Sequence, residues 1–185
     1  MTVKKAGPAP SMPVQVNVLP SKGMSIPVSA NEAERAWLAQ QAGVESVETF
    51  RADLTLKRWQ RDGVKLSGNL RADLTQACIV TLEPVAGHAE ETIERTFVPP
   101  DSRLAKPRLN SDGEWLLDAE GADPPDVLEA DTLEIWGVLL EHFLLAIDPF
   151  PRAPGAVFNE AENPQAEDDR PPSPFAVLNK LKRPD

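Results

Sequence analysis

The residues of this chain best suited to catalytic chemistry are one cysteine, Cys78, and two histidines, His88 and His142. A cysteine nucleophile acts as a thiolate and needs a base close by, but the spacing from Cys78 to either histidine fits no catalytic signature. Cys78 also continues the apolar, even-numbered side of an alternating stretch, where a free cysteine is usually a small core residue. One cysteine and two scattered histidines do not make a zinc site. We therefore expect no catalytic residue, no metal ligand and no cofactor.

A second chemical feature is a group of basic residues around a tryptophan, confined to nine consecutive positions. Its members are Lys57, Arg58, Trp59, Arg61 and Lys65. Cations interleaved with an aromatic ring can hold phosphates while the ring stacks on a base, so these five residues are candidate RNA contacts. The plainer interpretation is a solvated turn in which Trp59 covers the outer face of a sheet. The sequence alone leaves both interpretations open.

The charge of the chain is divided unevenly between its two halves. Residues 1–77 carry ten Lys or Arg and seven Asp or Glu, a net charge of +3, whereas residues 78–185 carry nine and twenty-two, a net charge of −13. An acidic protein as a whole repels phosphate backbones, yet a local basic patch can still bind RNA. The acidic half could equally attract a basic protein.

Two alternating stretches must position the basic group. The chain alternates from 48 to 58 and again from 64 to 74, with the apolar residues at even-numbered positions (50–56 in the first stretch; 64, 66, 70, 72 and 74 in the second), which is the pattern of half-buried strands. Between them, Arg61, Asp62 and Gly63 suit a three-residue hairpin loop in which glycine takes the left-handed conformation. The basic group would then lie at the end of a long antiparallel hairpin.

The letters RADLT occur twice in this hairpin, at 51–55 and at 71–75. With a loop at 61–63, Ala52 lies opposite Ala72 and the apolar residues share one face. On the other face, Arg51 would lie near Asp73 and Asp53 near Arg71. A two-residue loop would instead put the apolar faces on opposite sides. We therefore attribute the recurrence to cross-strand charge pairing, which helps to set register, rather than to duplication.

Two helices are expected. The first covers 31–43, with Asn31 and Glu34 as a capping box and Gly43 at its end. The second covers 132–147, with Asp131 and Glu134 as its capping box, and it is apolar almost all round, which favours burial in the core over a partner's surface. Short extended pieces are predicted at 14–19, 24–28, 90–98 and 114–118.

The composition changes after residue 158. Residues 159–172 are polar, acidic and rich in proline, which predicts a disordered linker. The segment after them has Phe175, Leu178 and Leu181 at helical spacing. It could bind a partner, pack on its own domain or extend into solvent.

Three segments carry a resemblance to a known family: QACIVTLEPV at 76–85, AIDPFPRAPGAVF at 146–158 and SPFAVLNKLK at 173–182. They resemble the YceD family, also called DUF177, whose proteobacterial members are described as large ribosomal RNA subunit accumulation proteins. The resemblance extends over roughly 12–182 and implies a non-enzymatic role in accumulation or processing of that RNA. Its motif residues, to which we give structural roles, are Cys78, Glu83, Pro84, Asp148, Pro149 and Pro151. Many relatives carry a second cysteine where this chain has Thr81, so a metal or disulfide role of such a pair does not carry over.

The sequence thus predicts an α+β domain at 12–158, with a mainly antiparallel sheet, a long hairpin and two principal helices. A flexible acidic tail follows at 159–185. The expected function is a non-enzymatic, cytoplasmic factor in ribosome biogenesis whose partner is large-subunit ribosomal RNA. One alternative is an acidic adaptor that holds a basic ribosomal protein, and another is an RNA-processing hydrolase. No apolar run is long enough to span a membrane and no secretory signal is evident, while the oligomeric state stays open.

Overall fold

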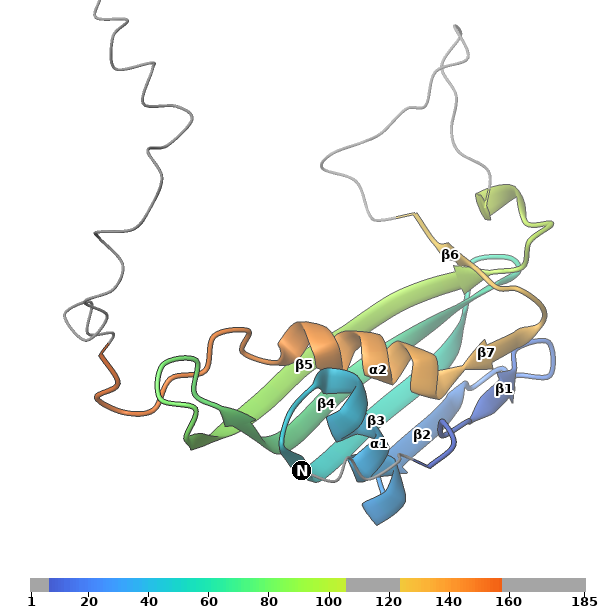
Figure 1. Cartoon of the computed structure of the whole chain (residues 1–185). Coiled ribbons are helices and arrows are strands. Elements are labelled where there is room, and N and C mark those ends of the chain that lie inside the picture. The colour runs from blue at the N-terminus through green and yellow to red at the C-terminus, as the bar shows by residue number, and fades with distance from the viewer. Residues whose placement is uncertain (1–6, 106–123, 158–185) are drawn as a thin grey trace, which may run out of the picture. The chain divides into compact units, whose positions relative to one another are not determined.

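A hairpin of two long strands forms the centre of the fold, in a computed structural model that describes residues 7–105 and 124–157 (Figure 1). Its strands, β3 (Ser46–Trp59) and β4 (Gly63–Ala77), belong to a five-stranded sheet of order β2-β3-β4-β5-β6. The other strands of that sheet are β2 (Met24–Ser29), β5 (Pro84–Val98) and β6 (Asp126–Val127), of which only β6 runs parallel to its neighbour. A two-stranded sheet joins β1 (Pro13–Gln15) to β7 (Thr132–Glu134), and a 3-10 turn, η1, covers Arg103–Ala105.

Both helices, α1 (Glu32–Ala42) and α2 (Ile135–Ala146), cover the same face of the large sheet (Figure 1). The apolar, even-numbered side chains of β3 and β4 are buried beneath them. Phe50 stacks on Trp136 at a ring-centroid distance of 5.7 Å and meets Phe143 edge-on at 5.4 Å. The polar, odd-numbered side chains are thereby left on the opposite face. An α+β fold with a mainly antiparallel sheet and two helices is confirmed.

The first helix is capped as its sequence predicts. The Asn31 side chain accepts a hydrogen bond from the Glu34 N–H, and the Glu34 carboxylate accepts one from the Asn31 N–H in return. Gly43 ends the helix in the left-handed conformation, with φ 66°.

The second helix begins later than predicted. Residues 132–134 form β7, which pairs with Pro13–Gln15, and Glu134 is the N-cap of a helix that starts at Ile135. The predicted capping box of Asp131 and Glu134 is therefore wrong. Pairing with a strand more than a hundred residues away displaced the first helical turn, and a local pattern cannot reveal such a partner. Burial of the helix in its own core is confirmed by Trp136, Leu139 and Phe143.

The extended pieces also differ in their bounds. The strand expected at 14–19 covers only Pro13–Gln15, and the one expected at 90–98 begins as early as Pro84. The strand expected at 24–28 is confirmed. The piece expected at 114–118, the acidic linker and the segment 173–182 lie outside the described residues.

The register of the central hairpin differs from the predicted one by two residues. Ala52 lies opposite Leu70 rather than Ala72, Arg51 lies opposite Arg71, and the loop is 60–62. A shift of two keeps every side chain on its face, so the alternation was right about the faces and could not fix the register. Two glycines, Gly63 and Gly68, favour the observed register, because each lies where this register leaves no room for a Cβ atom. A Cβ at Gly68 would lie 2.1 Å from the Asp53 carbonyl oxygen, and one at Gly63 would lie 2.9 Å from the Trp59 ring.

Candidate nucleic-acid interface

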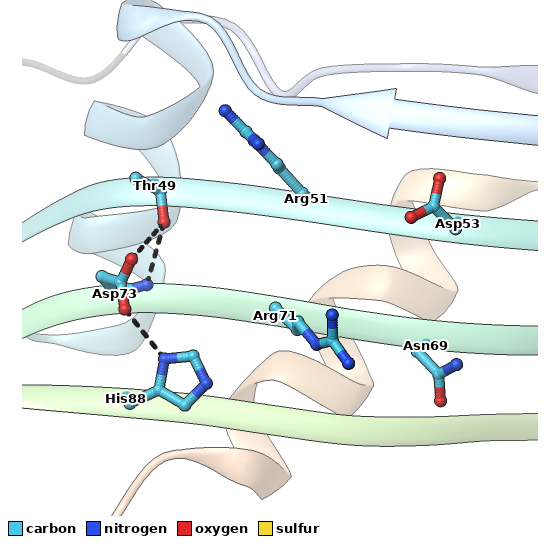
Figure 2. A pocket seen from close by; sticks show the side chains of 7 residues that line it. All are labelled: Thr49, Arg51, Asp53, Asn69, Arg71, Asp73 and His88. Carbon is cyan, nitrogen blue, oxygen red and sulfur yellow. Dashed lines mark hydrogen bonds and ion pairs between the residues drawn. The ribbon is translucent and has the colours of Figure 1, made fainter.

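The face of the sheet turned away from the helices carries a shallow hollow of about 430 Å³ (Figure 2). Seven side chains from β3, β4 and β5 line it: Thr49, Arg51, Asp53, Asn69, Arg71, Asp73 and His88. They come together because odd-numbered positions of neighbouring strands project to the same side of a sheet. Figure 2 shows the helices behind the strands that carry these residues.

One carboxylate of the hollow, that of Asp73, is held by neighbours on both sides. It accepts a hydrogen bond from the Thr49 hydroxyl at 2.7 Å, and its other oxygen lies 2.8 Å from Nδ1 of His88. The bond to His88 and then the bond to Thr49 lower the pKa of Asp73 below its ordinary value. Because the ionised carboxylate is only an acceptor, Nδ1 of His88 carries the proton of this bond.

The two arginines of the hollow are in different situations. Arg71 donates from Nε to the Glu90 carboxylate at 2.8 Å. Arg51 lies directly opposite Arg71 but has neither an ion pair nor a hydrogen bond from its side chain within the described part of the chain. The register predicted from the sequence placed each arginine beside an Asp partner across the hairpin. For this reason neither arginine was predicted to contact a ligand. The signal that could have found them is their position on the exposed, odd-numbered face.

The five candidate RNA contacts all lie at the loop end of the hairpin, but they do not share one role. Lys57 and Arg61 are exposed, and Trp59 is half-buried beside Gly63. Lys65, opposite Lys57, forms an ion pair with Glu94. Arg58 donates to the backbone carbonyls of Asn17 and Leu19 at 3.1 and 3.2 Å, so it ties the chain before β2 to the hairpin.

Cys78 is not part of a strand but the first residue of the turn between β4 and β5, and its side chain is fully buried. Its Sγ accepts hydrogen bonds from the backbone N–H groups of Val80, Thr81 and Ala153, at 3.3–3.4 Å. The bond from Ala153, followed by those from Thr81, lowers the pKa of Cys78 to about 6. The sulfur is therefore a buried acceptor of hydrogen bonds from within the protein.

Other motif residues lie around the same turn. The Ile79 N–H donates to the Pro151 carbonyl, and the Gln76 amide donates to the Asp148 carbonyl, both at 2.9 Å. The Cys78 N–H donates to the Glu83 carbonyl at 2.8 Å and closes the turn. These contacts hold the segment after α2 against the β4–β5 turn through backbone carbonyls, and the structural roles of the motif side chains stay a prediction.

The two histidines lie on different elements and neither contacts Cys78. His88 is in β5 on the open face, whereas His142 is buried in α2 with Nδ1 3.9 Å from the Glu91 carboxylate. Among the residues that the structure describes, no group of three His, Cys, Asp or Glu side chains could hold a metal ion. Within the same residues, no helix is long and apolar enough to cross a membrane.

Together these features define an α+β protein in which the described residues leave one polar face of the large sheet exposed. The family described as large ribosomal RNA subunit accumulation protein YceD matches residues 66–182, and the chain belongs to this family. The matched region begins within β4, so β1, β2, α1 and β3 precede it. No curated protein and no solved structure is significantly similar to the chain.

Proposed function

We propose that this protein supports the accumulation of large-subunit ribosomal RNA in the cytoplasm as a non-enzymatic factor that binds the RNA directly. The description of its family supports large-subunit ribosomal RNA as the molecule on which it acts. The observation that carries direct binding is a row of cations along the open face of β3 and the loop that follows it. Arg51, Lys57 and Arg61 make up this row, and none of them has an ion pair within the described residues.

The row is suited to an extended RNA strand. Arg51 and Lys57 lie on the same face six residues apart, which corresponds to about 20 Å along a strand. Trp59 continues the row on the same face and could stack on a base, which is worth about 1–3 kcal/mol in single-stranded complexes. Of the acidic side chains of the face, Glu90 and Glu94 lie on β5, with β4 between them and the row, whereas Asp53 lies within the row, between Arg51 and Lys57 on β3.

The adaptor alternative is less well supported, because four acidic side chains of the described residues are already paired with Arg or Lys. Glu90 and Glu94 bind Arg71 and Lys65, and Asp126 and Glu141 both bind Arg95. A basic ribosomal protein would have to break these pairs or use other carboxylates. The hydrolase alternative lacks support from Cys78, whose sulfur is fully buried.

The test is the salt dependence of binding to a transcript of large-subunit ribosomal RNA. Neutralising Lys57 and Arg61 together (Lys57→Gln with Arg61→Gln) should flatten the log–log slope by up to about two units, roughly one for each phosphate that the variant no longer neutralises. The matched control removes two cations elsewhere, Arg35→Gln with Arg152→Gln. Equal slopes for both double variants would refute the proposal, as would a wild-type protein that does not bind the transcript.

A further inference from the structure

We infer that the hollow on the open sheet face is a binding site for a phosphodiester group of the RNA backbone, with Arg51 and Arg71 as its principal ligands. The inference rests on the proposed function and deepens it, because it places a specific phosphate site away from the hairpin loop.

The hollow has more unpaired donor groups than unpaired acceptor groups among the described residues. Two of its acceptors are used within the protein, Asp73 by Thr49 and His88 and Oδ1 of Asn69 by the Thr92 hydroxyl at 3.1 Å, whereas the Asp53 carboxylate at its end is not. Donor groups remain without a partner in the described chain, namely the Arg51 guanidinium, the terminal nitrogens of Arg71 and the Asn69 amide nitrogen. A surface with spare donors is complementary to a ligand that only accepts, such as a phosphate.

Arg51 and Arg71 are two like charges in directly opposed positions of neighbouring strands. Directly opposed residues of an antiparallel pair have Cβ atoms about 4.5–5.5 Å apart, and like charges in that position are destabilising. Glu90 offsets the charge of Arg71, but no carboxylate within 4 Å offsets that of Arg51 in the described residues. Figure 2 shows Arg51 extended away from Arg71, toward β2. If the Arg51 side chain turned toward Arg71, one anion could bind both guanidinium groups and offset their like charges.

The chemistry of the site favours a phosphodiester over other anions. Guanidinium groups present forked donors that match phosphate oxygens in a bidentate manner. Asp53, at one end of the hollow, has no ion pair in the described residues and would repel a second negative charge, which disfavours densely charged anions. The hollow is shallow and includes residues of the same strand as Lys57, so a polymer can occupy it and continue along the row of cations.

The test compares three single variants in the same RNA-binding measurement, with a single-stranded oligonucleotide as the probe. Arg51→Gln should weaken binding by about fivefold to tenfold at low salt and reduce the slope by about one unit, as expected when one phosphate is no longer neutralised. Arg51→Lys should keep the slope but lose part of the affinity, because a lysine cannot bind in a bidentate manner. The matched control, Arg152→Gln, should behave as the wild type.

The outcomes separate this inference from the proposed function. A wild-type protein that does not bind RNA would overturn both. If the wild type binds and the Lys57–Arg61 double variant weakens binding, an unchanged Arg51→Gln variant would overturn the phosphate site alone. Polyglutamate serves as a second probe, and stronger Arg51-dependent binding to it than to RNA would also overturn the inference, in favour of an acidic peptide. Urea unfolding of each variant checks that the fold is kept, since the Arg51 side chain is exposed.

Discussion

Arg51 lies directly opposite Arg71 in the ladder between β3 and β4, so the two RADLT segments bring like charges together instead of opposite ones. The compensating groups come from β5, where Glu90 binds Arg71 and His88 binds Asp73. The repeated letters therefore do not neutralise each other across the hairpin. They leave one arginine of the open face, Arg51, without an ion pair among the described residues.

The register can be checked with engineered disulfides in a Cys78→Ala background. Thr55 lies opposite Ser67, and opposed residues have Cα atoms about 4.5–5.5 Å apart, within the range that a disulfide requires. Thr55→Cys with Ser67→Cys should oxidise readily. The control pair, Thr55→Cys with Asn69→Cys, would be opposed only in the register predicted from sequence. Faster oxidation of the control pair, read by gel mobility, would contradict the observed ladder.

Two glycine substitutions should change stability in opposite directions. Gly68→Ala would place a Cβ against the backbone of Asp53 and Leu54, at 2.1 and 2.8 Å, and should destabilise the protein by roughly 2–4 kcal/mol. Gly137→Ala meets nothing within 4 Å in the first turn of α2 and should stabilise the protein by about 0.5–1 kcal/mol. Urea unfolding measures both changes. A neutral Gly68→Ala variant would contradict the close approach of β3 and β4.

Cys78 should make stability depend on pH. Its pKa falls from an ordinary 9.0 to about 6 in the folded state, so the folded protein holds the thiolate where the unfolded chain holds the thiol. The resulting stabilisation is complete above the unfolded pKa and is lost as the pH falls through about 6. The melting temperature should therefore rise between pH 6 and pH 9 by more in the wild type than in Cys78→Ala.

Function should not depend on the chemistry of this thiol. Cys78→Ser replaces the sulfur with a smaller oxygen that does not ionise, so the three backbone N–H groups lose an anionic acceptor, and the change should lower stability more than RNA binding. A folded Cys78→Ser protein, checked by circular dichroism, that had lost RNA binding would show that the sulfur has a role beyond structure. The ultraviolet absorbance of the thiolate, followed against pH, gives an independent reading of the folded pKa.

Arg58 should differ from its neighbour Lys57 in its effect on folding. Arg58→Ala removes two hydrogen bonds to the carbonyls of Asn17 and Leu19 and should cost about 1 kcal/mol of stability. Lys57→Ala, on the exposed face, should stay within about 0.5 kcal/mol of the wild type. If urea unfolding gave the two variants equal stability, Arg58 would not be the tie between the chain before β2 and the hairpin.

Patterns confined to one element were sufficient to predict much of the fold. The capping box of Asn31 and Glu34 is a contact between residues three apart, so the sequence contains all that determines it. The alternation along β3 and β4 also correctly separated the buried face from the exposed face. Both features depend on local periodicity, which the sequence displays directly.

Features that depend on distant partners were not predictable in the same way. The first turn expected of α2 is replaced by a strand because Thr132–Glu134 pairs with Pro13–Gln15. The hollow needs β5 beside β4 in a particular register, which places Glu90 and not an aspartate of the hairpin beside Arg71. Likewise, the hydrogen bond from Arg58 to Asn17 joins two segments that no sequence pattern connects. The sequence could identify the basic group, but not which of its members already form hydrogen bonds or ion pairs within the protein, as Arg58 and Lys65 do.

The central claim, direct binding of large-subunit ribosomal RNA, is tested most directly by ultraviolet crosslinking in cells, followed by identification of both the RNA and the crosslinked peptides. We expect large-subunit ribosomal RNA to be recovered, with crosslinks in the peptides that contain Arg51, Lys57, Trp59 and Arg71. Arg51→Gln combined with Lys57→Gln and Arg61→Gln should reduce the recovered RNA, whereas Arg35→Gln with Arg152→Gln should not. Recovery of a basic ribosomal protein without RNA, or of neither, would contradict the account.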